Sequence, residues 1–174
     1  MPETSFVRHI KHTPDELLAM VADVENYPVF INLISALRVT HREQISDNHQ
    51  RFKAEAAVSY KFLSENFGCI VDVNEKDKVI RVSKGDRSGA VKDLSNSWKF
   101  YELSDGSTLI DFTVLVKLKA FPLEIMLRDV FDRAALKIMN AFEARADQLY
   151  QKIETPDLDV EKEAKTLGFS QSLS

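Results

Sequence analysis

Few residues of this 174-residue chain combine a reactive side chain with a neighbour that could activate it. The lone cysteine, Cys69, lies on an apolar strand face and has no nearby partner in sequence, so we expect it in the core. The histidines lack metal-site spacing and are expected at the surface; they are His9, His12, His41 and His49. The sequence contains no glycine-rich phosphate loop and no nucleophile elbow, which disfavours phosphoryl-transfer and serine hydrolase chemistry.

Two polar residues, Asn96 and Tyr60, are expected to face the interior. Asn96 lies between Leu94 and Trp98 on the apolar side of an alternating segment, and a buried amide needs a hydrogen-bond partner. It could bind a ligand carbonyl or a neighbouring backbone group, which is the more common outcome. The Tyr60 hydroxyl could bind a ligand or reach solvent at a strand end. No acidic residue falls clearly on the inner face as a paired acid and base, which disfavours acid–base catalysis.

Alternating segments between residues 35 and 116 position these side chains. Apolar and polar residues recur there with a period of two, which predicts strands with one dry face and one wet face. Most connections are short and carry turn residues, such as Asp105-Gly106, as antiparallel hairpins require. A short apolar segment at residues 5–10 precedes them, so we expect a sheet of about seven strands.

Helix signals lie on both sides of the strands. A capping box at Thr13 and Glu16 predicts a helix from Pro14 to about Val24, followed by a second short helical or irregular piece up to Ile34. Apolar residues at helical spacing predict a long helix over residues 122–151, about 45 Å in length. A stripe of that length needs a partner surface, and the concave apolar face of the sheet is the only candidate.

The predicted fold is therefore α+β, with a curved antiparallel sheet wrapped around a long C-terminal helix. We expect one ligand-binding domain at residues 1–154 and a flexible polar tail at residues 155–174, where the periodicity fades. A formal net charge of −4 disfavours a DNA-binding role. The lone cysteine and the N-terminus, which resembles no signal peptide, predict a cytoplasmic location.

The order of these elements resembles the helix-grip fold shared by START lipid-transfer domains, birch-pollen-type allergens and aromatic polyketide cyclases. Residues 21–30, 92–100 and 141–150 further resemble the coenzyme Q-binding subfamily, which includes bacterial proteins known as ribosome association toxins. The resemblance covers about residues 3–151. It implies non-catalytic binding of a polyprenyl quinone such as ubiquinone, in support of respiratory electron transport, with no cofactor beyond this bound lipid.

The ligand is expected between the long helix and the sheet. Ala54 and Ala56 are small residues near the middle of the sheet and would leave room under the helix, although the helix could instead pack down and fill the space. The resemblance favours the cavity. The predicted ligand-binding residues are Ala54, Ala56, Val58, Tyr60, Phe67, Asn96, Trp98, Phe112, Val114, Val130, Phe131, Met139 and Phe142.

The predicted cavity mouth consists of apolar residues in or next to loops, namely Tyr27, Phe30, Ile31, Leu33 and Phe121. Exposed, they would form an apolar rim able to touch the inner face of the cell membrane; alternatively they form a plug that closes the core. Two other functions stay open. One is a ribosome- or protein-binding module of the toxin type, and the other, ranked last, is an enzyme of the cyclase or dehydratase kind.

Overall fold

The computed structural model describes residues 2–61, 63–170 and 173. Seven strands form one antiparallel sheet in the order β1-β7-β6-β5-β4-β3-β2. Strands β2 to β7 pair consecutively, and β1 pairs with β7, so the first and last strands lie side by side. The strands are β1 (Glu3–Ile10), β2 (Ile34–Ser46), β3 (His49–Tyr60), β4 (Leu63–Asn74), β5 (Val79–Lys84), β6 (Val91–Glu102) and β7 (Thr108–Leu118). The predicted seven-stranded α+β fold is confirmed.

The helices connect and cover this sheet. They are α1 (Pro14–Ala22), the 3-10 turn η1 (Val24–Asn26), α2 (Tyr27–Phe30), α3 (Phe121–Leu149) and α4 (Val160–Thr166). The capping box that starts α1 is present, since the backbone N–H of Glu16 donates to the Thr13 hydroxyl at 3.2 Å and the Thr13 N–H donates to the Glu16 carboxylate at 3.1 Å. Pro28 lies in the first turn of α2, where its missing N–H costs no helical bond.

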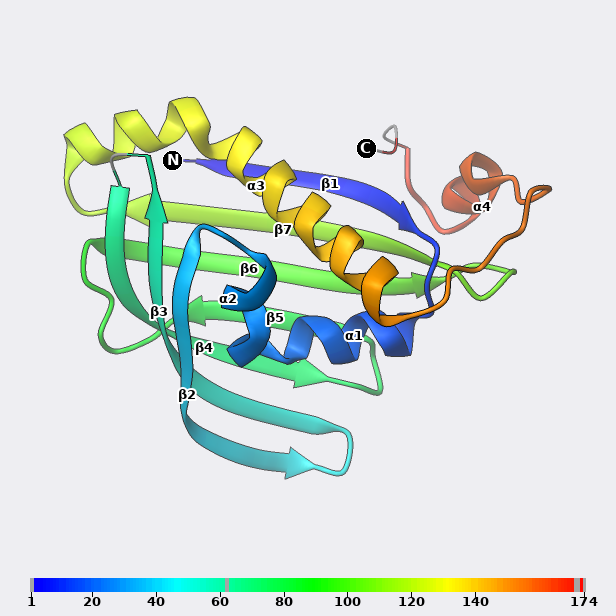
Figure 1. Ribbon diagram of the computed structural model, residues 1–174, viewed down its shortest axis with the longest axis horizontal. Helices are drawn as coiled ribbons and strands as arrows, with labels where there is room; N and C mark the ends of the chain where they lie inside the picture. The colour runs from blue at the N-terminus through cyan, green and yellow to red at the C-terminus, as the bar shows by residue number, and fades with distance from the viewer. Residues whose placement is uncertain (1, 62, 171–172, 174) are drawn as a thin grey trace.

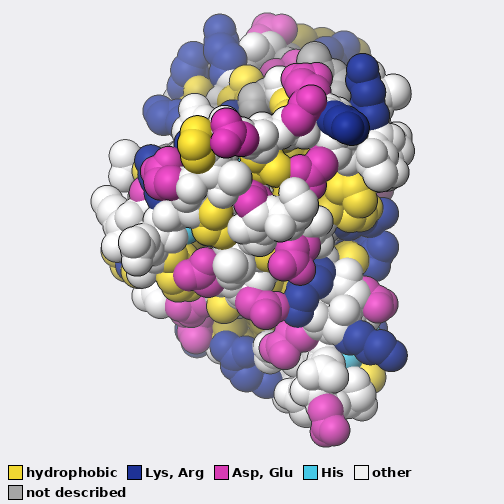
Figure 2. Space-filling view, turned by 90° about the vertical axis from the view of Figure 1, so that its right-hand side faces the viewer, with side chains coloured by type: hydrophobic (Ala, Val, Ile, Leu, Met, Phe, Trp, Pro, Cys, Tyr) yellow, Lys and Arg dark blue, Asp and Glu magenta, His cyan; other side chains and the backbone are white. Residues whose placement is uncertain are grey.

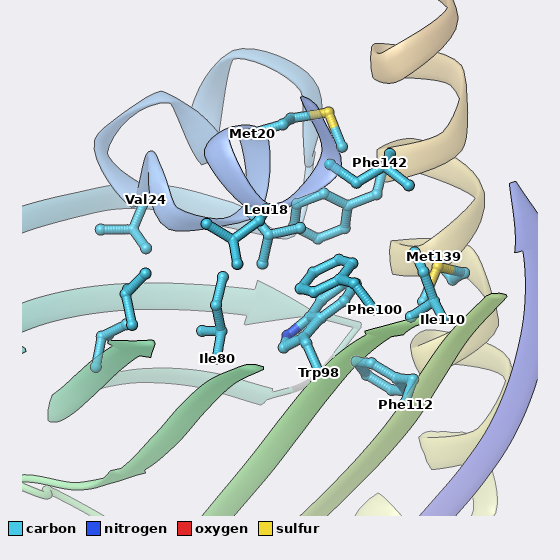
Figure 3. Packing of buried hydrophobic residues seen from close by; sticks show 14 of the residues in the cluster. Leu18, Met20, Val24, Ile80, Trp98, Phe100, Ile110, Phe112, Met139 and Phe142 are labelled. Atoms are coloured by element: carbon cyan, nitrogen blue, oxygen red, sulfur yellow. The ribbon is translucent and has the colours of Figure 1, made fainter. Parts of the chain in front are cut away.

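Helix α3 lies across the concave face of the sheet, with α1 and α2 beside its C-terminal half (Figure 1). Its buried stripe includes Leu127, Val130, Phe131, Met139 and Phe142, as the helical spacing predicts. The core between helix and sheet is aromatic at its centre, as Figure 3 shows. No helix in the described part of the chain is long and apolar enough to cross a membrane.

The C-terminal tail contains more structure than the sequence predicts. Helix α4 packs against the outer face of the sheet, where Ala164 contacts a cluster that includes Val7 and Leu109. The Glu163 carboxylate accepts hydrogen bonds from the backbone N–H and the hydroxyl of Ser104, at 2.8 and 2.9 Å. The sequence pattern misses this docking because a few scattered apolar anchors carry no periodic signal. The proposed domain boundary at residue 154 stays a prediction.

Candidate ligand-binding cavity

An apolar cavity of about 280 Å³ lies between α3 and the concave face of the sheet. Its walls come from β3 to β7, from α3 and from the segment of residues 24–37. This volume is about twice the ~150 Å³ that admits a benzene molecule and is close to the lower limit of typical ligand pockets. The helix therefore does not pack down and fill the space.

The structure brings most of the predicted site residues together around this cavity. Those that line it are Ala56, Val58, Tyr60, Phe67, Asn96, Trp98, Phe112, Val114, Val130, Phe131 and Phe142. The other two, Ala54 and Met139, are 2% and 0% exposed but lie in the packed core beside the cavity. Figure 3 shows Met139 next to Ile110, and both belong to the same core cluster and lie outside the cavity lining. Ligand contact by any of these residues stays a prediction.

Small side chains on both walls explain why a hollow exists here. On the sheet, Ala56 lies opposite Leu37 of β2 and Phe67 of β4. On the helix, Ala134 and Ala135 face the same space. Packing density in protein interiors is close to that of organic crystals, so three alanines in facing positions leave volume that no neighbour replaces. The helical pair was not predicted, because alanine in a helix carries no signal of what lies opposite.

An aromatic cluster lines one end of the cavity. The Trp98 ring meets the rings of Phe112 and Phe142 edge to face, with centroids 4.8 and 4.9 Å apart. The Trp98 indole N–H donates to the Asn96 side-chain oxygen at 2.8 Å, and the Asn96 amide donates to the Thr113 carbonyl at 2.9 Å. Of the two alternatives for Asn96, the backbone partner is thus confirmed, and its role here is to hold the indole in place.

A carboxylate also faces the cavity, and the sequence interpretation missed it. Glu65 is half-buried and is the one charged residue that lines the cavity among the residues that the structure describes. It belongs to the inward set of β4, which continues with Phe67, Cys69 and Val71 at alternate positions. Extending the alternation from Phe67 back by two residues would have found it. Glu65 lies directly opposite Val58, near the end of the strand.

Tyr60 lines the same end of the cavity as Glu65. It is half-buried and lies at the last position of β3, where the β3–β4 hairpin begins. The ammonium group of the exposed residue Lys61 lies 5.8 Å from the centre of its ring. The cavity thus has a hydrogen-bonded amide at its aromatic end and a tyrosine with a carboxylate at the end near the β3–β4 hairpin.

The predicted mouth residues do not form one exposed rim. Tyr27, Ile31 and Leu33 line the cavity, and Ile31 is 2% exposed. The Tyr27 hydroxyl donates to the carbonyl of Val21, and burial raises its pKa because the phenolate would be poorly solvated. Phe30 packs edge to face against Phe142, with ring centroids 5.2 Å apart. These four residues fit the plug alternative.

Phe121 is separate from this group, being 70% exposed at the start of α3 and outside the cavity lining. It is the one predicted mouth residue that the structure leaves fully at the surface, since the other four are buried or half-buried. Its role in membrane contact stays a prediction.

The remaining chemical candidates have structural explanations. Cys69 lines the cavity, and burial raises the pKa of its thiol to about 11, so the nucleophilic thiolate is scarce near neutral pH. The expected surface position is wrong for His12, which is fully buried and lies 2.8 Å from the Asp147 carboxylate, because the last turns of α3 cover it. Within residues 2–61, 63–170 and 173, no three His, Cys, Asp or Glu side chains are grouped to hold a metal ion.

Comparisons with known proteins identify relatives of this chain by sequence and by structure. Residues 10–143 match the family described as polyketide cyclase / dehydrase and lipid transport. The persistence and stress-resistance toxin PasT of Escherichia coli O6:H1 is 24% identical over 150 residues, which are 86% of this chain and 90% of the toxin. The ribosome association toxin RatA of Escherichia coli K12 is 23% identical over the same shares of both chains.

A solved structure gives a further match. The solution structure of an 18 kDa protein from Caulobacter crescentus is 33% identical, covers 86% of this chain and 98% of its own, and superimposes with a TM-score of 0.71. The superfamily inferred from the sequence is thereby confirmed, while the coenzyme Q-binding specificity stays a prediction. Since the family match spans most of the sheet, the cavity and the long helix, this chain belongs to the polyketide cyclase/dehydrase and lipid transport family, with a START-like fold.

Proposed function

We propose that the protein binds a polyprenyl quinone such as ubiquinone without transforming it, and thereby supports respiratory electron transport. The observation that carries the proposal is the apolar cavity with its aromatic end at Trp98, Phe112 and Phe142. Such a lining suits a flat ring and a hydrocarbon chain, neither of which needs many hydrogen bonds. In this proposal the protein acts as a carrier or chaperone of the lipid and is not an enzyme.

The energetics of burial are compatible with this ligand class. Burying one five-carbon isoprene unit contributes up to roughly 4 kcal/mol, at about 0.8 kcal/mol per methylene-sized group. Two enclosed units therefore offset much of an association cost of the order of 4–15 kcal/mol. A cavity of about 280 Å³ holds the ring or the first isoprene units, and not a long tail in full.

The chain contains its own reporter for this binding. Trp98 is the only tryptophan, is 3% exposed and lines the cavity. Titration with a short-tailed ubiquinone should quench its fluorescence saturably, beyond the quenching of free N-acetyltryptophanamide at equal quinone concentration. Lipid extraction of the purified protein followed by mass spectrometry tests for a co-purified quinone. Quenching equal to that of the free fluorophore, together with no extracted or added quinone retained, would refute the proposal.

Ribosome binding is a second candidate, because the names of the two toxin relatives refer to ribosome association or to stress resistance, and both align over 90% of their length. A contact driven by rRNA phosphates needs a continuous basic surface. On the face at the α4 end of the molecule, acidic and basic side chains are interspersed (Figure 2). Co-sedimentation with ribosomal subunits at increasing salt tests this candidate, and binding that weakens steeply with salt would favour it over the lipid carrier.

An enzymatic function is a third candidate, and the inward carboxylate of Glu65 is the observation that favours it. Cyclase and dehydratase chemistry needs an acid or base that reaches the bound substrate. Mass spectrometry of ligands recovered after incubation with the wild type and with Glu65→Gln would decide. A product formed by the wild type alone would favour an enzyme, and unchanged ligand in both samples would favour a carrier.

A further inference from the structure

Among the described residues, the cavity wall carries a single charge, that of Glu65. Apart from Glu65, the lining consists of apolar side chains with two tyrosines, one asparagine and one cysteine. Of these polar groups, Tyr27 and Asn96 are engaged in hydrogen bonds within the protein. A lone carboxylate in a wall of this kind is unusual, because charged side chains are seldom turned inward without a partner.

The fold holds the Glu65 side chain on the concave face. Glu65 pairs with Val58 in the β3–β4 ladder, and an adjacent pair on the same face is Ala56 with Phe67. A one-residue slip of this register would turn Phe67 outward, so the apolar set determines where Glu65 points. The β5–β6 connection lies close to the carboxylate, since a Cβ added to Gly89, whose φ is +55°, would lie 3.5 Å from it.

Within the part of the chain that the structure describes, no cation neutralises this carboxylate inside the cavity. Across the described ranges no ion pair joins Glu65 to a Lys, Arg or His side chain, and none of these residue types lines the cavity. The nearest described cation in sequence, Lys61, is exposed and does not line the cavity, and its ammonium group lies 5.8 Å from the centre of the Tyr60 ring. A ligand headgroup at the hairpin end therefore meets a negative charge.

We propose that Glu65 selects ligands by headgroup charge, so that the cavity accepts neutral amphiphiles carrying a hydroxyl donor and rejects fatty acids and other anionic lipids. This inference rests on the proposed lipid-binding function. Two like charges about 6 Å apart at an effective dielectric of about 20 weaken binding roughly 100-fold. Solvent at the half-buried carboxylate screens part of this repulsion, so the expected discrimination is roughly 10- to 100-fold. Among quinones, the hydroquinone form offers the hydroxyl donors that a carboxylate accepts.

A matched pair of ligands tests the selection. Farnesol and farnesoic acid share the same 15-carbon chain and differ in the neutral or anionic headgroup. By calorimetry at neutral pH, the wild type should bind farnesol at least about 10-fold more tightly than farnesoic acid. The isosteric variant Glu65→Gln should lose most of this preference, and Glu65→Lys should reverse it. Glu55→Gln is the control, since Glu55 lies on β3 and pairs with Arg38 outside the cavity.

The outcomes separate this inference from the function on which it rests. Equal affinity of the wild type for both ligands, or a preference that survives in Glu65→Gln, would overturn the selection by Glu65 while leaving lipid binding intact. If the wild type binds neither ligand and takes up no quinone, the proposed function fails and the selection fails with it. Thermal melting of Glu65→Gln establishes that the variant is folded before its affinities are compared.

Discussion

Replacing Ala56 with phenylalanine tests whether the cavity is a real hollow that a ligand uses. Ala56 lines the cavity from the middle of β3 and lies opposite Phe67. A phenyl ring at this position points into space that no protein atom fills. The same substitution at Ala54, two residues away on the same face, points into packed core beside Cys69 and Val39.

The expected magnitudes follow from the volumes. A ring of benzene size needs on the order of 150 Å³, which is about half of the 280 Å³ cavity. A ligand that loses one isoprene unit of burial loses up to about 4 kcal/mol, or about 1,000-fold in Kd, and a ligand that shifts within the cavity loses less. We therefore expect Ala56→Phe to weaken quinone binding by at least about 30-fold. Its free energy of unfolding should change by less than about 1 kcal/mol.

Two measurements on each variant check this prediction. Trp98 fluorescence titration with a short-tailed ubiquinone gives the affinity, and urea unfolding gives the stability. Ala54→Phe serves as the matched control and should cost about 1–3 kcal/mol of stability, because overpacking a filled core strains its neighbours. Equal destabilisation by Ala56→Phe and Ala54→Phe would show that the space beside Ala56 is filled. Unchanged quinone affinity in Ala56→Phe would show that the ligand does not use this space.

Three further predictions concern the supports of the fold. Asn96→Leu should cost about 1–3 kcal/mol in urea unfolding, because the buried Trp98 indole N–H loses its acceptor; unchanged stability would show that solvent reaches the indole. Ending the chain at Glu154 should lower the free energy of unfolding by roughly 1–3 kcal/mol, because residues such as Leu109 lose the cover of α4. Calorimetric melting of the full and shortened chains measures this loss, and equal melting temperatures would contradict it. Burial lowers the pKa of His9 below 6.5, so the unfolded chain binds the proton first and the stability of the fold decreases as the pH falls through about 6.5. The variant His9→Gln should show a smaller decrease in the same pH range. Identical pH profiles of stability for the wild type and the variant would contradict a pKa lowered by burial.

The fold could be predicted from the sequence because its determinants are local. Alternation along a strand fixes which side chains share a face, so Phe67 and Cys69 could be placed on the dry side without coordinates. The capping box at Thr13 and Glu16 likewise locates the start of α1 within a single turn.

The candidate site was only partly predictable, because neighbouring residues on one face can have different surroundings. Ala54 and Ala56 have the same side chain, the same strand and the same orientation, yet one is in packed core and the other lines a hollow. His12 looked like a surface residue beside a helix cap, but the last turns of α3, more than 130 residues away in sequence, bury it.

By itself the sequence determined the seven strands with their faces, the helices α1 and α3, and the family, since these depend on residue type and spacing over short distances. The tertiary structure alone decided that three alanines from β3 and α3 face one another, that α4 docks on the outer sheet face, and that no cation among the described residues pairs with Glu65 in its apolar wall. A cavity is the volume that side chains from segments far apart in sequence leave unfilled. The energy of a buried charge depends on the burial, charges and hydrogen bonds that the surrounding elements provide. Neither quantity is encoded in any short stretch of the chain.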